Sequence, residues 1–251
     1  MRDERQAALE VIAGEVRGCT RCRLHETRTR AVPGEGDPDT EVVFVGEGPG
    51  MNEDREGRPF VGRAGGLLVR LLASIGWQRN DVFITNVVKC RPPGNRDPEA
   101  DEIAACAPYL RRQLEVLDPA VVVTLGRFSM QAFIPGARIG QVHGTTHPVD
   151  PGTGAAAALA FAMYHPAAAL RSSGVEQTSF EDIARVPSVL LRARELRAGS
   201  AEPAATTGAP PVTTAAPPTA AAAAATPPRV AAPAAVAAEP APDDASQLTL
   251  F

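Results

Sequence analysis

Four cysteines in this chain of 251 residues have the residue type and partial spacing of a metal site. Cys19 and Cys22 form the CxxC pair of "CTRC", and 15 residues separate Cys90 from Cys106. The chain opens without an apolar leader, which disfavours disulfides, so four thiolates meeting at one metal is a better interpretation than four unrelated thiols. Zinc ribbons pair two CxxC knuckles, and only one is present. The irregular spacing suits an iron–sulfur cluster at least as well, but spacing alone does not choose the metal.

A second set of residues could bind a flat, polar heterocycle. Glu47, Asn86 and His165 each stand at or just after the end of an apolar segment, and Phe60 lies near Glu47 in sequence. They offer a carboxylate, a carboxamide, an imidazole and an aromatic ring. Each also has an ordinary structural alternative: a helix-cap partner, a loop brace, a structural histidine and a core side chain, respectively.

The stretch "GEGPG" at 46–50 carries glycines that let the backbone approach another group closely. A phosphate-binding loop is a further reading, but this stretch has neither the Walker lysine nor the full GxGxxG pattern.

Alternating strands and helices must position these residues. Apolar strands are predicted at 41–46, 81–88, 120–126 and 158–166, and helical periodicity at 4–17, 65–77, 98–119, 127–134 and a closing segment broken by Pro187. The strands are almost continuously apolar, which predicts an α/β fold in three α/β/α layers around a central, mostly parallel four-stranded sheet. Ligands of such sheets bind at the carboxyl ends of the strands, where the second set of residues stands.

Composition divides the chain near residue 198. Residues 198–251 hold 21 Ala, 10 Pro and 7 Thr and have no aromatic residue before the last position. Such a segment has little to bury, so we expect a folded domain at 1–197, a disordered linker at 198–242 and a short terminal peptide at 243–251. The chain carries −4 overall and the tail carries −3, from one arginine against four acids, so the domain is near neutral. A strongly basic, non-specific nucleic-acid binder is therefore excluded.

The motifs together resemble one known family. "GEGPGMNEDREGRPFVGRAGGLL", "NVVKCRPPGNRDP", "AVVVTLG" and "YHPAAALR", in this order and with the four cysteines, resemble the family-four, iron–sulfur uracil-DNA glycosylases across about residues 10–195. The resemblance implies the uracil-DNA glycosylase fold. It also implies a four-iron four-sulfur cluster held by Cys19, Cys22, Cys90 and Cys106, and hydrolysis of the bond between uracil and deoxyribose in DNA, which begins base excision repair.

The resemblance also implies roles for the pocket. A duplex base must be flipped out to be reached. We expect Phe60 to stack on it, Gly48 to approach it, Asn86 to distinguish uracil from cytosine and His165 to donate to uracil O2. A carboxylate stabilises the developing sugar cation and orients water, a task we assign to Glu47 or Glu53 without ranking them.

Contacts outside the pocket are expected from further residues. The candidate DNA contacts are Arg63, Arg91, Leu170 and Arg171, with Leu170 or Arg171 as the wedge that fills the gap in the base stack. The terminal "QLTLF" resembles the bacterial sliding-clamp-binding motif, which implies clamp contacts by Gln247, Leu248, Leu250 and Phe251.

The expected protein is a cytoplasmic, nucleoid-associated monomer with no membrane segment. Two rival functions remain. One is a non-catalytic module that binds uracil-containing DNA and recruits repair factors. The other is a glycosylase acting on a broader set of deaminated bases.

Overall fold

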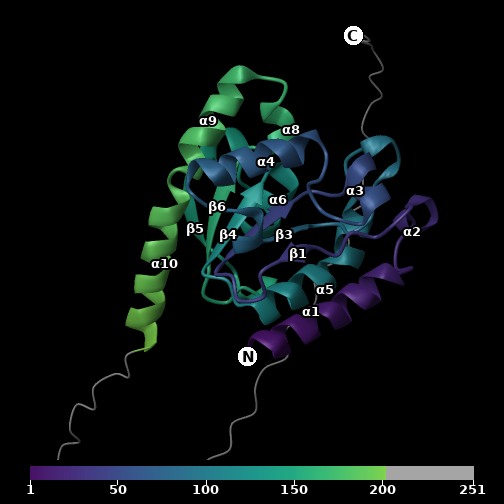
Figure 1. Ribbon diagram of the computed structural model, residues 1–251, viewed down its shortest axis with the longest axis horizontal. Coiled ribbons are helices and arrows are strands. Elements are labelled where there is room, and N and C mark those ends of the chain that lie inside the picture. The colour runs from purple at the N-terminus through teal and green to yellow at the C-terminus, as the bar shows by residue number, and fades with distance from the viewer. Residues whose placement is uncertain (202–251) are drawn as a thin grey trace, which may run out of the picture. The chain divides into compact units, whose positions relative to one another are not determined.

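A single mixed sheet forms the centre of the fold in the computed structural model, which describes residues 1–201 (Figure 1). Within those residues the sheet has six strands in the order β1-β3-β2-β4-β6-β5. The strands are β1 (Glu35–Gly36), β2 (Val42–Gly46), β3 (Phe83–Asn86), β4 (Val121–Leu125), β5 (Thr146–Pro148) and β6 (Leu159–Met163). The four central strands β3, β2, β4 and β6 are parallel, which confirms the predicted core of the sheet.

The central strands are buried on both faces because successive side chains point to opposite sides. In β2, Val43 and Val45 belong to one core cluster, and Val42 and Phe44 belong to the other. The continuous apolar runs that predicted a doubly covered sheet therefore reflect two separate cores, one above and one below the strands.

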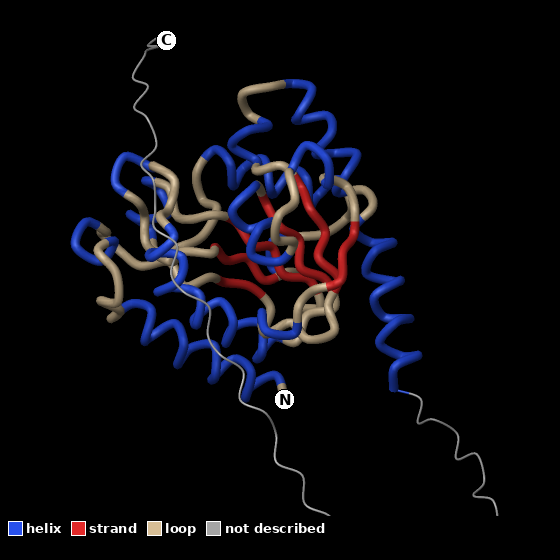
Figure 2. Tube along the Cα trace, turned by 180° about the vertical axis from the view of Figure 1, so that it is seen from behind, coloured by secondary structure: helices blue, strands red, loops and turns tan. Residues whose placement is uncertain are grey.

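Helices cover each face of the sheet (Figures 1 and 2). The helices are α1 (Arg2–Arg17), α2 (Leu24–Thr27), α3 (Met51–Glu56), α4 (Arg63–Ser74), α5 (Ala100–Leu117), α6 (Arg127–Phe133), α7 (Ile139–Val142), α8 (Pro166–Ala169), α9 (Ser173–Ile183) and α10 (Val186–Ala201). The core on one face includes apolar residues of α1, α5 and α6. The core on the opposite face includes apolar residues of α4, α9 and α10.

The order of the strands places a crevice at one edge of the sheet. The chain passes from β2 to β3 on one side and then crosses to β4 on the other side of β2. At such a reversal, the loops that leave the carboxyl ends of neighbouring strands run in opposite directions, and a crevice forms between them. The loops after β2, β3, β4 and β6 all leave from that edge because these strands are parallel.

Some details of the fold were not predicted. The antiparallel edge strands β1 and β5 span only two and three residues, too few for a periodic signal. The closing helical segment is broken as predicted, with Pro187 in the first turn of α10. That helix continues to Ala201, beyond the expected domain end at residue 197. Among the described residues no helix is both long and apolar enough to span a membrane.

Candidate active site and cysteine pocket

A cleft of about 640 Å³ opens at the carboxyl edge of the sheet. Its walls come from the four loops after β2, β3, β4 and β6, as the parallel arrangement predicts. The lining includes six of the predicted catalytic and base-binding residues: Glu47, Gly48, Glu53, Phe60, Asn86 and His165. The volume is in the range of small-molecule sites, so a nucleotide base fits.

Asn86 is the most unusual side chain of the cleft. It is only 1% exposed, and its Oδ1 has no hydrogen-bond partner within the described residues. An unpaired buried oxygen costs about 1 to 3 kcal/mol, so a ligand with an N–H donor would be stabilised here. The structural alternative for Asn86, a brace for its own loop, would have engaged this oxygen.

Gly46 brings Asn86 and Phe60 together. A Cβ on Gly46 would overlap Asn86 Oδ1 and lie 2.7 Å from the Phe60 ring. Only glycine leaves that space free, so the last residue of β2 lets the amide and the ring share one corner of the cleft.

Phe60 lies in a backbone conformation that is rare for non-glycine residues. Its φ is +51°, in the left-handed region, and the side chain is 6% exposed. Its ring packs near that of His165, with centroids 5.8 Å apart and an interplanar angle of 29°. The ring belongs to the core cluster and also lines the cleft, so its position is that of a core side chain and remains compatible with the predicted stacking on a base.

The two candidate carboxylates have different surroundings. Glu53 Oε1 accepts hydrogen bonds from the backbone N–H of Val61 at 2.9 Å and of Gly62 at 2.8 Å, so it braces the turn after Phe60. No hydrogen bond or ion pair to the Glu47 carboxylate occurs within residues 1–201. Burial raises the pKa of Glu47, and Asp97 adds to the effect while Arg127 opposes it. Glu47 is therefore the uncommitted carboxylate, and it caps no helix.

His165 is held in one neutral tautomer. Its Nδ1 accepts a hydrogen bond from the backbone N–H of Ala167 at 3.1 Å at the start of α8. The proton of the neutral ring is then on Nε2. Burial lowers the pKa of His165 to about 4, with a further contribution from Arg171 and an opposing one from Glu53. His165 therefore caps α8, which is a structural role, and the capping also fixes which nitrogen is the donor.

The expected DNA contacts are less closely grouped. Arg171 is exposed and lines the cleft. Leu170 is partly buried and packs against the core, Arg63 is exposed at the start of α4, and Arg91 donates to Asn95 Oδ1 at 2.7 Å. Of these four residues only Arg171 lies at the cleft itself.

Sequence reasoning missed several residues of the rim. Asp97 and Arg127 both line the cleft and form an ion pair, and Tyr164 lines it beside His165. Arg127 is the second residue after β4 and Tyr164 directly follows β6, so their places at strand ends were a usable signal. Asp97 lies beyond the "PPGN" turn, which carries no such signal.

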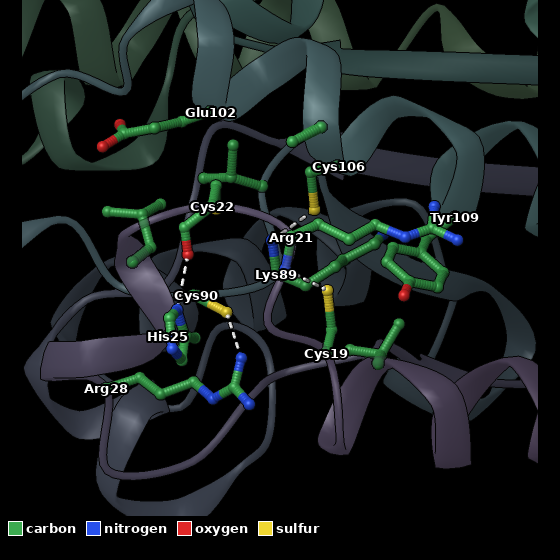
Figure 3. Close-up of a pocket in the computed structure, with 14 residues that line it drawn as sticks. Cys19, Arg21, Cys22, His25, Arg28, Lys89, Cys90, Glu102, Cys106 and Tyr109 are labelled. Atoms are coloured by element: carbon green, nitrogen blue, oxygen red, sulfur yellow. Dashed lines mark hydrogen bonds between the residues drawn. The ribbon is translucent and has the colours of Figure 1, made fainter.

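All four cysteines line a second pocket, at the junction of α1, α2, the loop after β3 and α5 (Figure 3). They are free thiols, and Cys90 and Cys106 are buried. Three of the four sulfurs accept hydrogen bonds: Arg28 donates to Cys90 Sγ at 3.1 Å, the backbone N–H of Lys89 to Cys106 Sγ at 3.2 Å and that of Arg21 to Cys19 Sγ at 3.5 Å. Donors of this kind stabilise thiolates bound to iron.

Four cysteines that line one pocket are a donor set that an iron–sulfur cluster can use. Within residues 1–201, no three His, Cys, Asp or Glu side chains are grouped closely enough to hold one metal ion. A cluster spaces its four thiolates more widely than one ion, so the shared pocket remains compatible with it. Burial raises the pKa of the Cys90 thiol and raises that of Cys106 to about 11. Bound metal reverses this effect because it binds the deprotonated thiol.

Glu102 connects the cysteine pocket with the cleft. It is fully buried on α5 and lines the cysteine pocket, and its carboxylate accepts from Arg23 at 3.1 Å and from Arg96, a cleft residue, at 2.6 Å. The hydrogen bond from Arg96 is the main cause that lowers the pKa of Glu102 to about 2. Glu102 therefore ties the loop of the CxxC pair to the rim of the cleft.

Lys89 makes a second connection behind the cleft. It is 1% exposed, and its Nζ donates to Thr85 Oγ1 at 2.6 Å, to the Asn86 carbonyl at 2.8 Å and to Gln113 Oε1 at 2.6 Å. These three acceptors match the three N–H donors of an ammonium group. Burial lowers the pKa of Lys89 to about 7, opposed by Cys106. The residue next to Cys90 thus supports the backbone of Asn86.

The predicted clamp-binding residues Gln247, Leu248, Leu250 and Phe251 lie outside the described residues, as does most of the predicted linker.

Comparison with known proteins gives the family. A family model described as "Uracil DNA glycosylase superfamily" matches residues 33–185. The chain is 48% identical over 188 residues to the type-4 uracil-DNA glycosylase of Saccharolobus solfataricus, covering 72% of this chain and 86% of that protein. It is 48% identical over 185 residues to that of Sulfurisphaera tokodaii, covering 71% and 83%. It is 44% identical over 188 residues to that of Thermotoga maritima, covering 74% and 96%.

The family match over residues 33–185 includes all six strands and the four loops that line the cleft. The chain therefore belongs to the uracil DNA glycosylase superfamily.

Proposed function

We propose that this protein is a uracil-DNA glycosylase that hydrolyses the bond between uracil and deoxyribose and leaves an abasic site for repair. The unpaired Oδ1 of buried Asn86 carries the proposal. Uracil N3–H can donate to this oxygen, and the Asn86 amide N–H can donate to uracil O4. Cytosine presents the opposite pattern at both positions and would leave the amide unpaired, the kind of mismatch that discriminates strongly in a buried site.

Binding requires the base to leave the duplex stack. Phe60 offers its ring as a stacking surface in the same corner of the cleft as Asn86, and Gly48 lines the adjoining wall. Stacking on an aromatic side chain contributes about 1 to 3 kcal/mol per base. Phe60 thus stacks on the face of the flipped uracil, and Asn86 recognises its edge by hydrogen bonds.

His165 is suited to assist the departure of the base. When the glycosidic bond breaks, negative charge develops on uracil O2. The Nε2–H of His165 is the free donor of a neutral ring, because Nδ1 is engaged by Ala167. With a pKa of about 4 the ring stays neutral at physiological pH, so it stabilises the leaving anion by a hydrogen bond without transferring a full proton.

Glu47 is the better candidate for the carboxylate beside the sugar. The sugar gains cationic character as the bond breaks, and a carboxylate stabilises that charge and orients the attacking water. Glu53 already uses one oxygen to brace the turn at Val61 and Gly62, whereas Glu47 has both oxygens available.

Glu47→Gln should therefore lower kcat/KM for uracil excision by about 10²- to 10³-fold. The wild-type rate should fall at acid pH as Glu47 becomes protonated, and this should occur at a higher pH than for an ordinary glutamate because its pKa is raised. This fall in rate at acid pH should be missing from the pH profile of Glu47→Gln. Measurement of kcat/KM between about pH 4.5 and 8 tests both points.

The matched control is Glu53→Gln, whose amide oxygen can still accept from Val61 and Gly62, and we expect it to lose less than about tenfold. The reverse result, with Glu53→Gln the more damaged enzyme, would assign the role to Glu53.

Cys19, Cys22, Cys90 and Cys106 would hold a four-iron four-sulfur cluster in the second pocket. The shared pocket, the all-sulfur donor set and the N–H groups directed at sulfur support this assignment. When bound, the cluster would supply a structural crosslink between the CxxC loop, the loop after β3 and α5.

We propose Arg171 as the DNA contact nearest to the extruded nucleotide, since it is exposed and lines the cleft. Arg63 and Arg91 remain proposed phosphate contacts farther from the cleft. The packing of Leu170 against the core favours Arg171 over Leu170 as the wedge.

The direct test is an excision assay on a uracil-containing oligonucleotide, followed by alkali to cleave abasic sites. Strand cleavage only where uracil is present would support the proposal. Binding of the oligonucleotide without cleavage, by protein that carries its cluster, would favour a non-catalytic binding module. Excision of hypoxanthine or xanthine at a comparable rate would favour the broader specificity.

The C-terminal "QLTLF" is proposed to bind a sliding clamp. A flexible tether of about 50 residues spans roughly 35–45 Å root-mean-square, so a clamp-held enzyme could inspect nearby DNA at raised effective concentration.

Deletion of 247–251 should abolish retention on immobilised bacterial clamp and leave excision on short oligonucleotides unchanged, because no clamp is present there. Deletion of five linker residues such as 221–225 is the size-matched control and should keep clamp binding. Clamp binding that survives loss of 247–251 would contradict the tether.

A further inference from the structure

The position of the Phe60 ring depends on the backbone that carries it. A residue other than glycine does not favour a φ of +51°, so the surrounding structure must hold this conformation. Gly65 supplies one side of the support, since a Cβ there would overlap the Phe60 carbonyl. Glu53 holds the next two residues through the backbone N–H groups of Val61 and Gly62.

Arg79 holds the carbonyls on the other side. Its guanidinium donates to the Phe60 carbonyl at 3.0 Å and to the Pro59 carbonyl, and its Nε donates to Glu35 Oε1 at 2.9 Å. Each of the three guanidinium nitrogens thus has an acceptor. Arg79 is 18% exposed and is absent from the lining of the cleft, so it supports the loop from behind.

Glu35 fixes the direction of Arg79. It lies in edge strand β1, which pairs with β3, so the carboxylate is attached to the same sheet as Asn86. Burial raises the pKa of Glu35, but hydrogen bonds from Arg58 and Arg79 outweigh this effect and hold the pKa below its ordinary value. The carboxylate is therefore ionised and paired at neutral pH.

We propose that Arg79, oriented by Glu35, is a positioning residue that holds the left-handed turn at Phe60 and so keeps the ring where an extruded base stacks. The planar guanidinium group is needed because it donates to two successive carbonyls and a carboxylate at the same time. A lysine ammonium at the end of a flexible stem does not reproduce this geometry. The inference rests on the proposed stacking role of Phe60.

Arg58 provides a matched control. It donates to the same carboxylate through Nε at 2.8 Å and Nη2 at 2.9 Å. Within the described residues it makes no hydrogen bond to the Pro59 or Phe60 carbonyl. Arg58→Met and Arg79→Met therefore each remove one partner of Glu35, but only the second releases the turn.

The test is a double-mutant cycle on steady-state uracil excision, with kcat and KM measured separately. Arg79→Met should reduce kcat/KM by about 30- to 100-fold, since a small displacement of a binding group has effects of this size. Arg58→Met should change it less than about threefold. When Phe60 is already replaced by alanine, Arg79→Met should lower kcat/KM by less than about a further threefold, because the side chain that Arg79 positions is absent.

A full additional loss in the Phe60→Ala background would overturn the proposal and give Arg79 a general structural role, as would equal losses for Arg58→Met and Arg79→Met. If Arg79→Met does not fold, Arg79→Lys takes its place in the same cycle. We expect the same pattern, a loss of kcat/KM in the wild-type background and little further loss in the Phe60→Ala background. Unchanged excision by Phe60→Ala alone would refute the stacking role itself. An impaired Phe60→Ala with an unimpaired Arg79→Met would refute only the inference about Arg79.

Discussion

Replacing Asn86 by aspartate should reduce kcat/KM for uracil excision by about 10³-fold, which is the upper end of the loss expected from one buried donor. Asparagine both accepts and donates at the edge of the base, whereas an ionised aspartate only accepts. Uracil O4 would then face a carboxylate oxygen instead of an N–H, and the charge would lie in a corner that is 1% exposed. Protonated aspartate matches cytosine instead, so slow cytosine excision is expected at acid pH.

The assay compares uracil- and cytosine-containing oligonucleotides with wild type, Asn86→Asp and Asn86→Ala. Alanine lacks both hydrogen-bonding groups, so it should lose uracil excision without gaining any activity on cytosine. Uracil excision at the wild-type rate by either variant would remove Asn86 from the base-reading site.

Cys106→Ser should remove the visible absorbance of a bound iron–sulfur cluster and destabilise the fold. Loss of a metal ligand is among the few changes that cost about 4 kcal/mol or more. For a domain of this size, that corresponds to a fall in Tm of about 8 to 16 °C. Cys106 accepts from the Lys89 backbone, and Lys89 supports Asn86, so uracil excision should fall as well.

Ala105→Ser is the matched control because Ala105 lines the same pocket on α5, and the variant adds a hydroxyl without removing a thiol. It should keep the absorbance and most of the stability. Iron and sulfide analysis of both purified variants gives a readout independent of activity. A Cys106→Ser protein with full iron content and unchanged Tm would contradict the assignment of this ligand.

Sequence patterns were sufficient for the features that depend on neighbours along the chain. The apolar runs that became β2, β3, β4 and β6 are local signals, and the rule that ligands bind at strand ends then selected Glu47, Asn86 and His165. The resemblance of the motifs to one family agreed with the matches found by comparison.

Features that depend on distant contacts were not accessible in this way. Glu47 and Glu53 are the same residue type six positions apart, and they are distinguished by contacts such as the bonds of Glu53 to Val61 and Gly62. Arg79 reaches the Phe60 carbonyl across 19 positions, and Glu35 meets Arg79 across 44 positions. The two-residue strand that carries Glu35 is too short to leave a pattern.

Lys89 has a practical consequence for handling the protein. It is the only lysine among the 25 basic residues of the sequence, and its amine is buried with all three N–H groups engaged. Amine-reactive dyes, biotin esters and surface-coupling reagents therefore have no accessible side-chain target on the folded protein. For the same reason, acetylating and ubiquitin-transferring enzymes meet no exposed lysine acceptor on the folded protein.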